Sequence, residues 1–333
     1  MELNETQRYF IEEHVEDFRD GFITRRELVR RVTLIAGGAT AAAAILAACD
    51  ATPRPASASA PAASAAPGVA ASASAQPLAT PPARATTDGI TVQPNDPRIR
   101  IVPATAAVVK GSGDGATMIS YLARPANQGL FGSVLVIHEN RGLTEHIKDV
   151  VRRVATAGFV GLGVDLISRA GGAEKLSDAA AYQAELAKRS TADMVADVQA
   201  ALAFLKQRSE MANGSLAIVG FCFGGGIVWS SVAAGADLKA AVPFYGPQPS
   251  NFADIAKTKT AASAVYAEQD TRITGTASDM EAQLKKAGVP YQITVYPGVN
   301  HAFHNDTNAD RYNAAQAQKA WVATIEWFKK YLA

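Results

Sequence analysis

The sequence predicts an α/β protein with a mostly parallel central sheet and helices on both faces. Short apolar segments alternate with helix-like segments through most of the chain after residue 130. This alternation is typical of strands joined by helical crossovers, which pair in parallel. One apolar segment, Leu216–Val219, ends in Gly-Phe-Cys-Phe-Gly at 220–224. Because such sheets bind ligands beyond the carboxyl ends of their strands, we expect the site near Cys222.

The remaining elements follow from the same patterns. A hairpin is predicted from strands at 106–110 and 117–123, joined across the glycine-rich residues 111–115. Further strands are predicted at 134–137, 159–164, 216–219, 240–244, 264–266 and 291–296. Helices are predicted at 144–157, where Thr144 caps the start and Gly158 ends the helix, and at 178–207, 227–234, 278–287 and 314–331.

Cys222 occupies the centre of a strand-turn-helix segment with the Gly-x-nucleophile-x-Gly form. The sharp turn strains the central residue, and glycines at 220 and 224 avoid collisions with neighbouring backbone. A helix that begins here favours the thiolate form of Cys222 and offers the Phe223 N–H to an oxyanion. The alternative is that Cys222 is a small buried apolar residue, as most free cysteines are.

Composition limits the classes of function. The chain has 333 residues, 48% hydrophobic residues and a net charge of +1, which indicates a globular protein with no nucleic-acid partner. We expect three parts: a signal peptide at 1–48, a tether at 49–88 and a catalytic domain at 89–333.

The first 48 residues are typical of a signal peptide. The charged segment 24–30 precedes an uncharged, Ala- and Gly-rich stretch at 32–48. The pair Arg25-Arg26 resembles a twin-arginine signal, which exports folded proteins.

Leu46-Ala47-Ala48-Cys49 resembles the lipobox of bacterial lipoproteins, which implies cleavage before Cys49 and lipidation of its thiol. The Ala-, Pro- and Ser-rich residues 51–85 suit a flexible tether. We therefore expect an exported lipoprotein anchored to the outer face of the cytoplasmic membrane. Two alternatives are an uncleaved membrane anchor and an ordinary secretory signal in which Cys49 is incidental.

A catalytic thiol needs a base and an acid that orients the base. Of the five histidines, His301 lies in a glycine-containing loop after the last predicted strand. The acid is expected after the preceding strand, where Asp270 is favoured over Glu268 because it lies further into the loop. The chain order Cys222, Asp270, His301 is that of α/β-hydrolases. The alternative for His301 is an exposed loop histidine.

These motifs, together with Ile-His-Glu-Asn-Arg-Gly-Leu at 137–143 and Asn-His-Ala-Phe at 300–303, resemble the dienelactone hydrolase (carboxymethylenebutenolidase) family over residues 105–333. The resemblance implies the α/β-hydrolase fold. It also implies that Glu139 lies beside the cysteine and that the Asn140 N–H is the second oxyanion donor. Tyr245 matches an aromatic position near the family's pocket, and Phe303 and Arg141 are further pocket candidates.

The sequence departs from the family at Asn305, where members that act on dienelactone carry an arginine for the substrate carboxylate. We therefore expect a monomeric hydrolase of small esters or lactones that uses a thioester acyl-enzyme and needs no metal or organic cofactor. Arg141, Arg169 and Arg272 are the candidates for a substitute charge. The alternative is a tethered binding lipoprotein that keeps the fold without efficient turnover.

Overall fold

The structure is a computed structural model that describes residues 2–48, 91–104, 108–176, 178–208 and 211–332. The chain divides into two compact units. Among the described residues, one unit contains 2–3 and 7–48, and the other contains 4–6 and those from 91 onward. The expected tether at 49–88, with Cys49, lies outside the described residues.

The first unit is helical, with α1 (Glu5–Arg19), α2 (Arg25–Ala36) and α3 (Ala39–Ala48). Helix α2 begins at the arginine pair because Thr24 caps it, accepting a hydrogen bond from the Glu27 N–H. Among the described residues no single helix is long and apolar enough to cross a bilayer. Within the described part of the chain, α2 and α3 together are long and apolar enough, but the chain bends by 116° between them.

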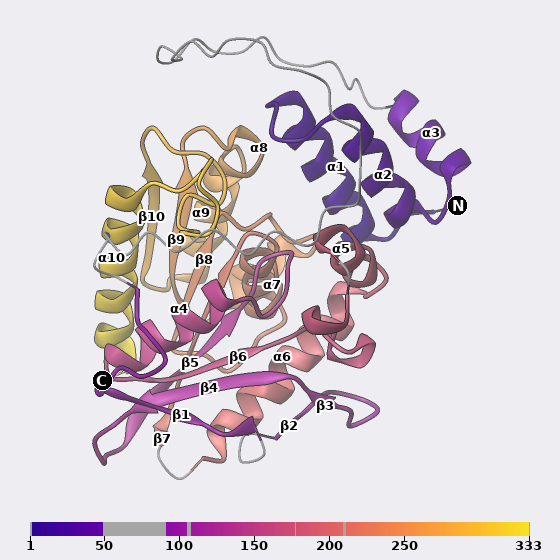
Figure 1. The fold of residues 1–333 in the computed structure, drawn as a ribbon. Coiled ribbons are helices and arrows are strands. Elements are labelled where there is room, and N and C mark those ends of the chain that lie inside the picture. The colour runs from indigo at the N-terminus through magenta and orange to yellow at the C-terminus, as the bar shows by residue number, and fades with distance from the viewer. Residues whose placement is uncertain (1, 49–90, 105–107, 177, 209–210, 333) are drawn as a thin grey trace, which may run out of the picture. The chain divides into compact units, whose positions relative to one another are not determined.

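The second unit contains an eight-stranded sheet in the order β1-β4-β6-β5-β7-β8-β9-β10 (Figure 1). The strands from β5 to β10 pair in parallel, and β4 pairs antiparallel with both β1 and β6. Their bounds are Ile99–Val102 (β1), Ser120–Pro125 (β4), Phe131–Ile137 (β5), Val160–Val164 (β6), Met211–Phe221 (β7), Ala240–Phe244 (β8), Ala261–Ala267 (β9) and Tyr291–Tyr296 (β10).

Helices flank this sheet (Figure 1). The longer ones are α4 (Glu145–Thr156), α5 (Ala179–Ala187), α6 (Thr191–Lys206), α7 (Phe223–Ala233), α9 (Ala277–Ala287) and α10 (Ala314–Leu332). The short segments are α8 (Thr271–Thr274), η2 (Ser168–Ala170), η3 (Ala173–Lys175) and η4 (Phe252–Lys257). Trp229 of α7 and Met280 of α9 join one buried apolar cluster with Ala264 and Tyr266 of β9. Burial of these side chains holds α7 and α9 against the sheet and fixes the position of the turn before α7.

The predicted fold class is confirmed, and the structure corrects several element predictions. The hairpin contains β2 (Val109–Lys110) and β3 (Thr117–Met118), and residues 120–123 of its predicted second strand belong to β4 in the main sheet. Residues 106–107 of its predicted first strand lie outside the described residues. Strand β1 was not predicted. The helix predicted at 178–207 is divided, because Ser190 is extended (φ −75°, ψ 149°) and caps α6 through the Asp193 N–H.

The parallel strands bring five loops to one edge of the sheet. Residues of the expected site follow β5, β7, β8, β9 and β10 directly in the chain. Since the carboxyl ends of parallel strands lie at the same edge, this topology gathers residues that are distant in sequence.

Candidate active site

The turn between β7 and α7 holds Cys222 in a strained backbone conformation, with φ 56° and ψ −125°. Gly220 and Gly224 must be glycines because any side chain there would collide with neighbouring backbone. A Cβ on Gly220 would lie 2.3 Å from the Gly224 carbonyl oxygen, and one on Gly224 would lie 2.3 Å from the His138 carbonyl oxygen. Neither neighbour can move easily, so the turn accepts only glycine at these positions. Phe223 is the first residue of α7, so this helix begins four residues before its predicted start at 227.

Asp270 and His301 lie together at the carboxyl ends of β9 and β10. His301 Nδ1 is 2.6 Å from Asp270 Oδ2. Asp270 also caps α8 by accepting a hydrogen bond from the Ile273 N–H, which fixes the carboxylate. Glu268 has another partner, since its Oε2 accepts a hydrogen bond from the Gly298 N–H at 2.8 Å. The structure therefore brings Asp270, rather than Glu268, to the histidine.

His301 also lies beside Cys222, with a ring nitrogen within 4.8 Å of Sγ. Nδ1 bonds to Asp270, which leaves Nε2 to face the sulfur. Burial lowers the pKa of His301, but the negative charges of Asp270 and Cys222 raise it by more, so this pKa lies well above its usual value. The three residues thus form a chain from carboxylate to imidazole to sulfur, in the arrangement of a nucleophile, base and orienting acid.

The loop after β5 carries the residues expected to support the thiol. Glu139 is buried, and its Oε2 accepts a hydrogen bond from Asn305 Nδ2 at 2.5 Å. Asn305 therefore contacts the carboxylate that the family resemblance implies to lie beside Cys222. Asn140 is half-buried on the same loop, whereas Arg141 is exposed. Arg141 thus does not join the buried group.

Aromatic side chains pack around the loop that carries His301. The ring centroids of Tyr245 and His301 lie 4.9 Å apart, and Phe303 packs edge-on to Tyr245 at 5.6 Å. Burial and then the charges of Glu139 and Cys222 raise the pKa of Tyr245 well above its usual value, so its hydroxyl stays protonated. Tyr245 and Phe303 thus form a wall beside the histidine.

A buried ionic cluster, not predicted from the sequence, joins the His301 loop to α4. Asp306 Oδ1 lies 2.7 Å from His146 Nδ1, and Asp306 Oδ2 accepts a hydrogen bond from Arg153 at 3.1 Å. Arg153 also bonds to Asp149 of the same helix. The sequence could not reveal this cluster, because Arg153 and Asp306 are about 150 positions apart in the chain. Their charges were the only signal. The cluster fixes the loop relative to the helix that follows Glu139.

Arg169 forms ion pairs away from the candidate site. It therefore does not replace the positive charge that family members carry at the position of Asn305. It forms ion pairs with Asp114 at 2.9 Å and Asp197 at 2.7 Å. These contacts hold the glycine-rich turn between β2 and β3 rather than the site.

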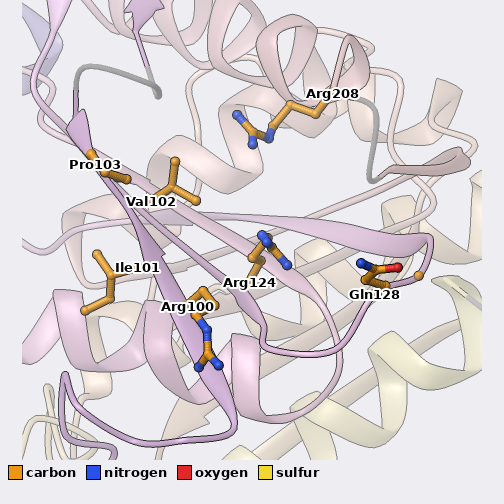
Figure 2. Close-up of a pocket in the computed structure, with 8 residues that line it drawn as sticks. Arg100, Ile101, Val102, Pro103, Arg124, Gln128 and Arg208 are labelled. Atoms are coloured by element: carbon orange, nitrogen blue, oxygen red, sulfur yellow. The ribbon is translucent and has the colours of Figure 1, made fainter.

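A separate cavity of about 610 Å³ opens along β1 and β4 (Figure 2). Its lining includes Arg100, Arg124, Arg208 and Gln128. None of the predicted site residues lines it, so the cavity is distinct from the group around Cys222.

Comparisons with known proteins agree with this architecture. Residues 118–332 match the Dienelactone hydrolase family. A protein of Methylorubrum extorquens named "Putative carboxymethylenebutenolidase" is 34% identical over 223 residues, covering 64% of this chain and 76% of that protein. A protein of the same name from Salmonella typhi is 32% identical over 239 residues, covering 68% and 88%.

Among solved structures, a "Putative Dienelactone Hydrolase" from Klebsiella pneumoniae superposes with a TM-score of 0.62 at 30% identity. The match covers 70% of this chain and 99% of that one. With the parallel sheet, the glycine-flanked turn and the match over most of the second unit, the chain belongs to the dienelactone hydrolase family of α/β-hydrolases.

Proposed function

We propose that this protein hydrolyses small esters or lactones through a thioester formed on Cys222. The observation that carries the proposal is the position of His301, whose Nδ1 bonds to Asp270 while its ring lies beside Cys222. This is the arrangement that transfers a thiol proton to a held imidazole. The family membership supports a hydrolase.

In the proposed mechanism, Cys222 Sγ attacks the ester carbonyl and its proton passes to His301 Nε2. The N–H groups of Phe223 and Asn140 stabilise the oxyanion. His301 then protonates the leaving alcohol, and the acyl group remains on sulfur as a thioester. A water molecule, deprotonated by His301, attacks the thioester, and the thiol leaves with the proton as the acid is released.

The substrate class follows from Asn305. Its amide donates to Glu139 and carries no positive charge, so it gives a substrate carboxylate no ionic partner. We infer that the preferred acyl group is uncharged.

The test compares Cys222→Ala with Cys49→Ala, which removes the other cysteine. We expect Cys222→Ala to lose p-nitrophenyl acetate hydrolysis and Cys49→Ala to keep it. The intact mass of the parent during turnover should rise by one acetyl group, and peptide mapping should place this group on Cys222. An alanine variant at 222 that hydrolyses at the parent rate would exclude the mechanism. Reversible ligand binding without acylation would instead support a tethered binding lipoprotein.

We also propose that the protein is an exported lipoprotein held at the outer face of the cytoplasmic membrane. Support comes from the arginine pair at 25–26 and the lipobox-like residues that end at Cys49. A diacylglyceryl group supplies two acyl chains, which suffice for stable attachment. Cys49→Ser should then release the protein from membranes without changing its specific activity. Recovery of the parent from the cytoplasmic fraction, with Met1 present and Cys49 unmodified, would refute this location.

A further inference from the structure

His138 bonds to the backbone of the residue that follows it. Its Nδ1 lies 2.5 Å from the Glu139 carbonyl oxygen, and its Nε2 accepts a hydrogen bond from the Leu166 N–H at 3.1 Å. Because a backbone N–H can only donate, Nε2 carries no proton. In the neutral ring the proton is therefore on Nδ1, which donates to the Glu139 carbonyl.

Further contacts keep His138 in this state. The Tyr182 hydroxyl lies 3.1 Å from His138 Nε2 and donates to Asp165 Oδ1 at 2.8 Å. Asp165 in turn accepts hydrogen bonds from two backbone N–H groups of the loop after β6. Burial lowers the pKa of His138 despite the opposing charges of Asp165 and Glu139, so the ring remains neutral. The ring is thus fixed in orientation and in tautomer.

The held carbonyl determines the direction of the next N–H. A trans peptide is planar, so the Asn140 N–H points opposite to the Glu139 carbonyl and away from the His138 ring. The same loop passes over the first turn of α7, where a Cβ on Gly224 would touch the His138 carbonyl oxygen. The Glu139 side chain and Cys222 also lie close enough to Tyr245 that both of their charges act on its hydroxyl.

We propose that His138 is a positioning residue for the oxyanion hole, because its Nδ1–H holds the Glu139–Asn140 peptide with the N–H turned toward the Cys222 side. This inference rests on the proposed acyl transfer. It adds that His138 acts on the oxyanion indirectly. By holding the Glu139 carbonyl, it orients the Asn140 N–H that stabilises this charge in the transition state. Tyr182 and Asp165 act one step further out, since they hold the ring.

The test compares His138→Leu with His138→Asn. The asparagine places an amide nitrogen where Nδ1 lies and retains the donor, whereas leucine removes it. We expect the acylation rate constant with p-nitrophenyl acetate to fall about 10²-fold in His138→Leu, as when one oxyanion donor is lost, and to stay near the parent value in His138→Asn. Alkylation of Cys222 by iodoacetamide forms no oxyanion, so its rate should be unchanged in both variants.

Several outcomes would overturn the inference while leaving the proposed function intact. In one, the parent forms the acyl-enzyme and His138→Leu forms it equally fast. In another, His138→Leu loses acylation and iodoacetamide alkylation to the same extent. Should His138→Leu not fold, His138→Gln replaces it, because its amide reaches the Nε2 position instead. Equal acylation by the Asn and Gln variants would then refute the role of Nδ1. A parent that forms no acyl-enzyme would refute the proposed function itself.

Discussion

The side-chain amide of Asn305 donates a hydrogen bond to the Glu139 carboxylate, although the two residues are 166 positions apart in the chain. The contact joins the loop that carries His301 to the loop that carries Asn140, the proposed oxyanion donor. Because the Asn305 amide is neutral, it does not cancel the negative charge of the Glu139 carboxylate.

Asn305→Arg should shift the substrate preference toward esters with a carboxylate in the acyl group. A charge-assisted hydrogen bond contributes about 1.5–3 kcal/mol, which is equivalent to a roughly tenfold or larger change in relative kcat/KM. The measurement compares p-nitrophenyl acetate with the p-nitrophenyl monoester of succinate. Asn305→Gln, which stays neutral, is the control. An unchanged ratio in the arginine variant would show that position 305 does not set this preference.

Glu139→Gln should make Cys222 react faster with iodoacetamide. A carboxylate near the sulfur disfavours the thiolate by like-charge repulsion, and the amide removes that repulsion. The second-order rate constant of alkylation across neutral pH measures the effect. Glu268→Gln is the matched control, because this carboxylate bonds to the Gly298 N–H and does not join the group at Cys222. Equal or faster labelling of the parent would contradict the prediction.

His304→Phe should make the fold less sensitive to acid. His304 is fully buried, stacks on Phe221, and neither ring nitrogen has a hydrogen-bond partner among the described residues. Burial, with Arg153 and His146 nearby, lowers its pKa well below the usual value. The unfolded chain therefore binds a proton at His304 below about pH 6.5 that the folded chain does not bind.

Because of this difference, His304 lowers the free energy of unfolding of the parent as the pH falls below about 6.5. The slope is at most roughly 1.4 kcal/mol per pH unit. His301, whose pKa is raised, contributes with the opposite sign in both proteins and cancels in the comparison. Denaturant unfolding at pH 7.5, 6.0 and 5.0 measures the slope. Parallel curves for the parent and His304→Phe would disprove the assignment.

Gly224→Ala should destabilise the protein more than Gly235→Ala. At 224 the new Cβ meets the His138 carbonyl oxygen, whereas at 235 there is open space and the cost comes only from the positive φ of 75°. We expect about 1–2 kcal/mol at 235 from the positive φ. At 224, where the contact at 2.3 Å is with backbone, we expect about 3 kcal/mol or more from overpacking. Unfolding free energies measure both. Equal losses would mean that the loop after β5 moves away at little cost.

The alternation of strands and helices and the turn at Cys222 were predictable because both depend on local patterns. The carboxylate that contacts His301 was harder to predict, since Glu268 and Asp270 follow the same strand and only the path of the loop separates them. The division of the helix at Ser190 was missed because the flanking residues continue a helical pattern. The contacts of Asn305 and His138 depend on which loops meet across the sheet, so periodicity could not reveal them.

Among the described residues, the non-glycine side chains with positive φ are Cys222, Tyr245 and Ala302, and all three follow strands of the candidate site. Each holds a conformation that L-residues avoid, at an energy that the rest of the fold must offset. A search for heat-resistant variants would therefore be drawn to these positions, where glycine relieves the backbone. The same substitutions would loosen the site, so selection for thermal tolerance and selection for turnover should diverge here first.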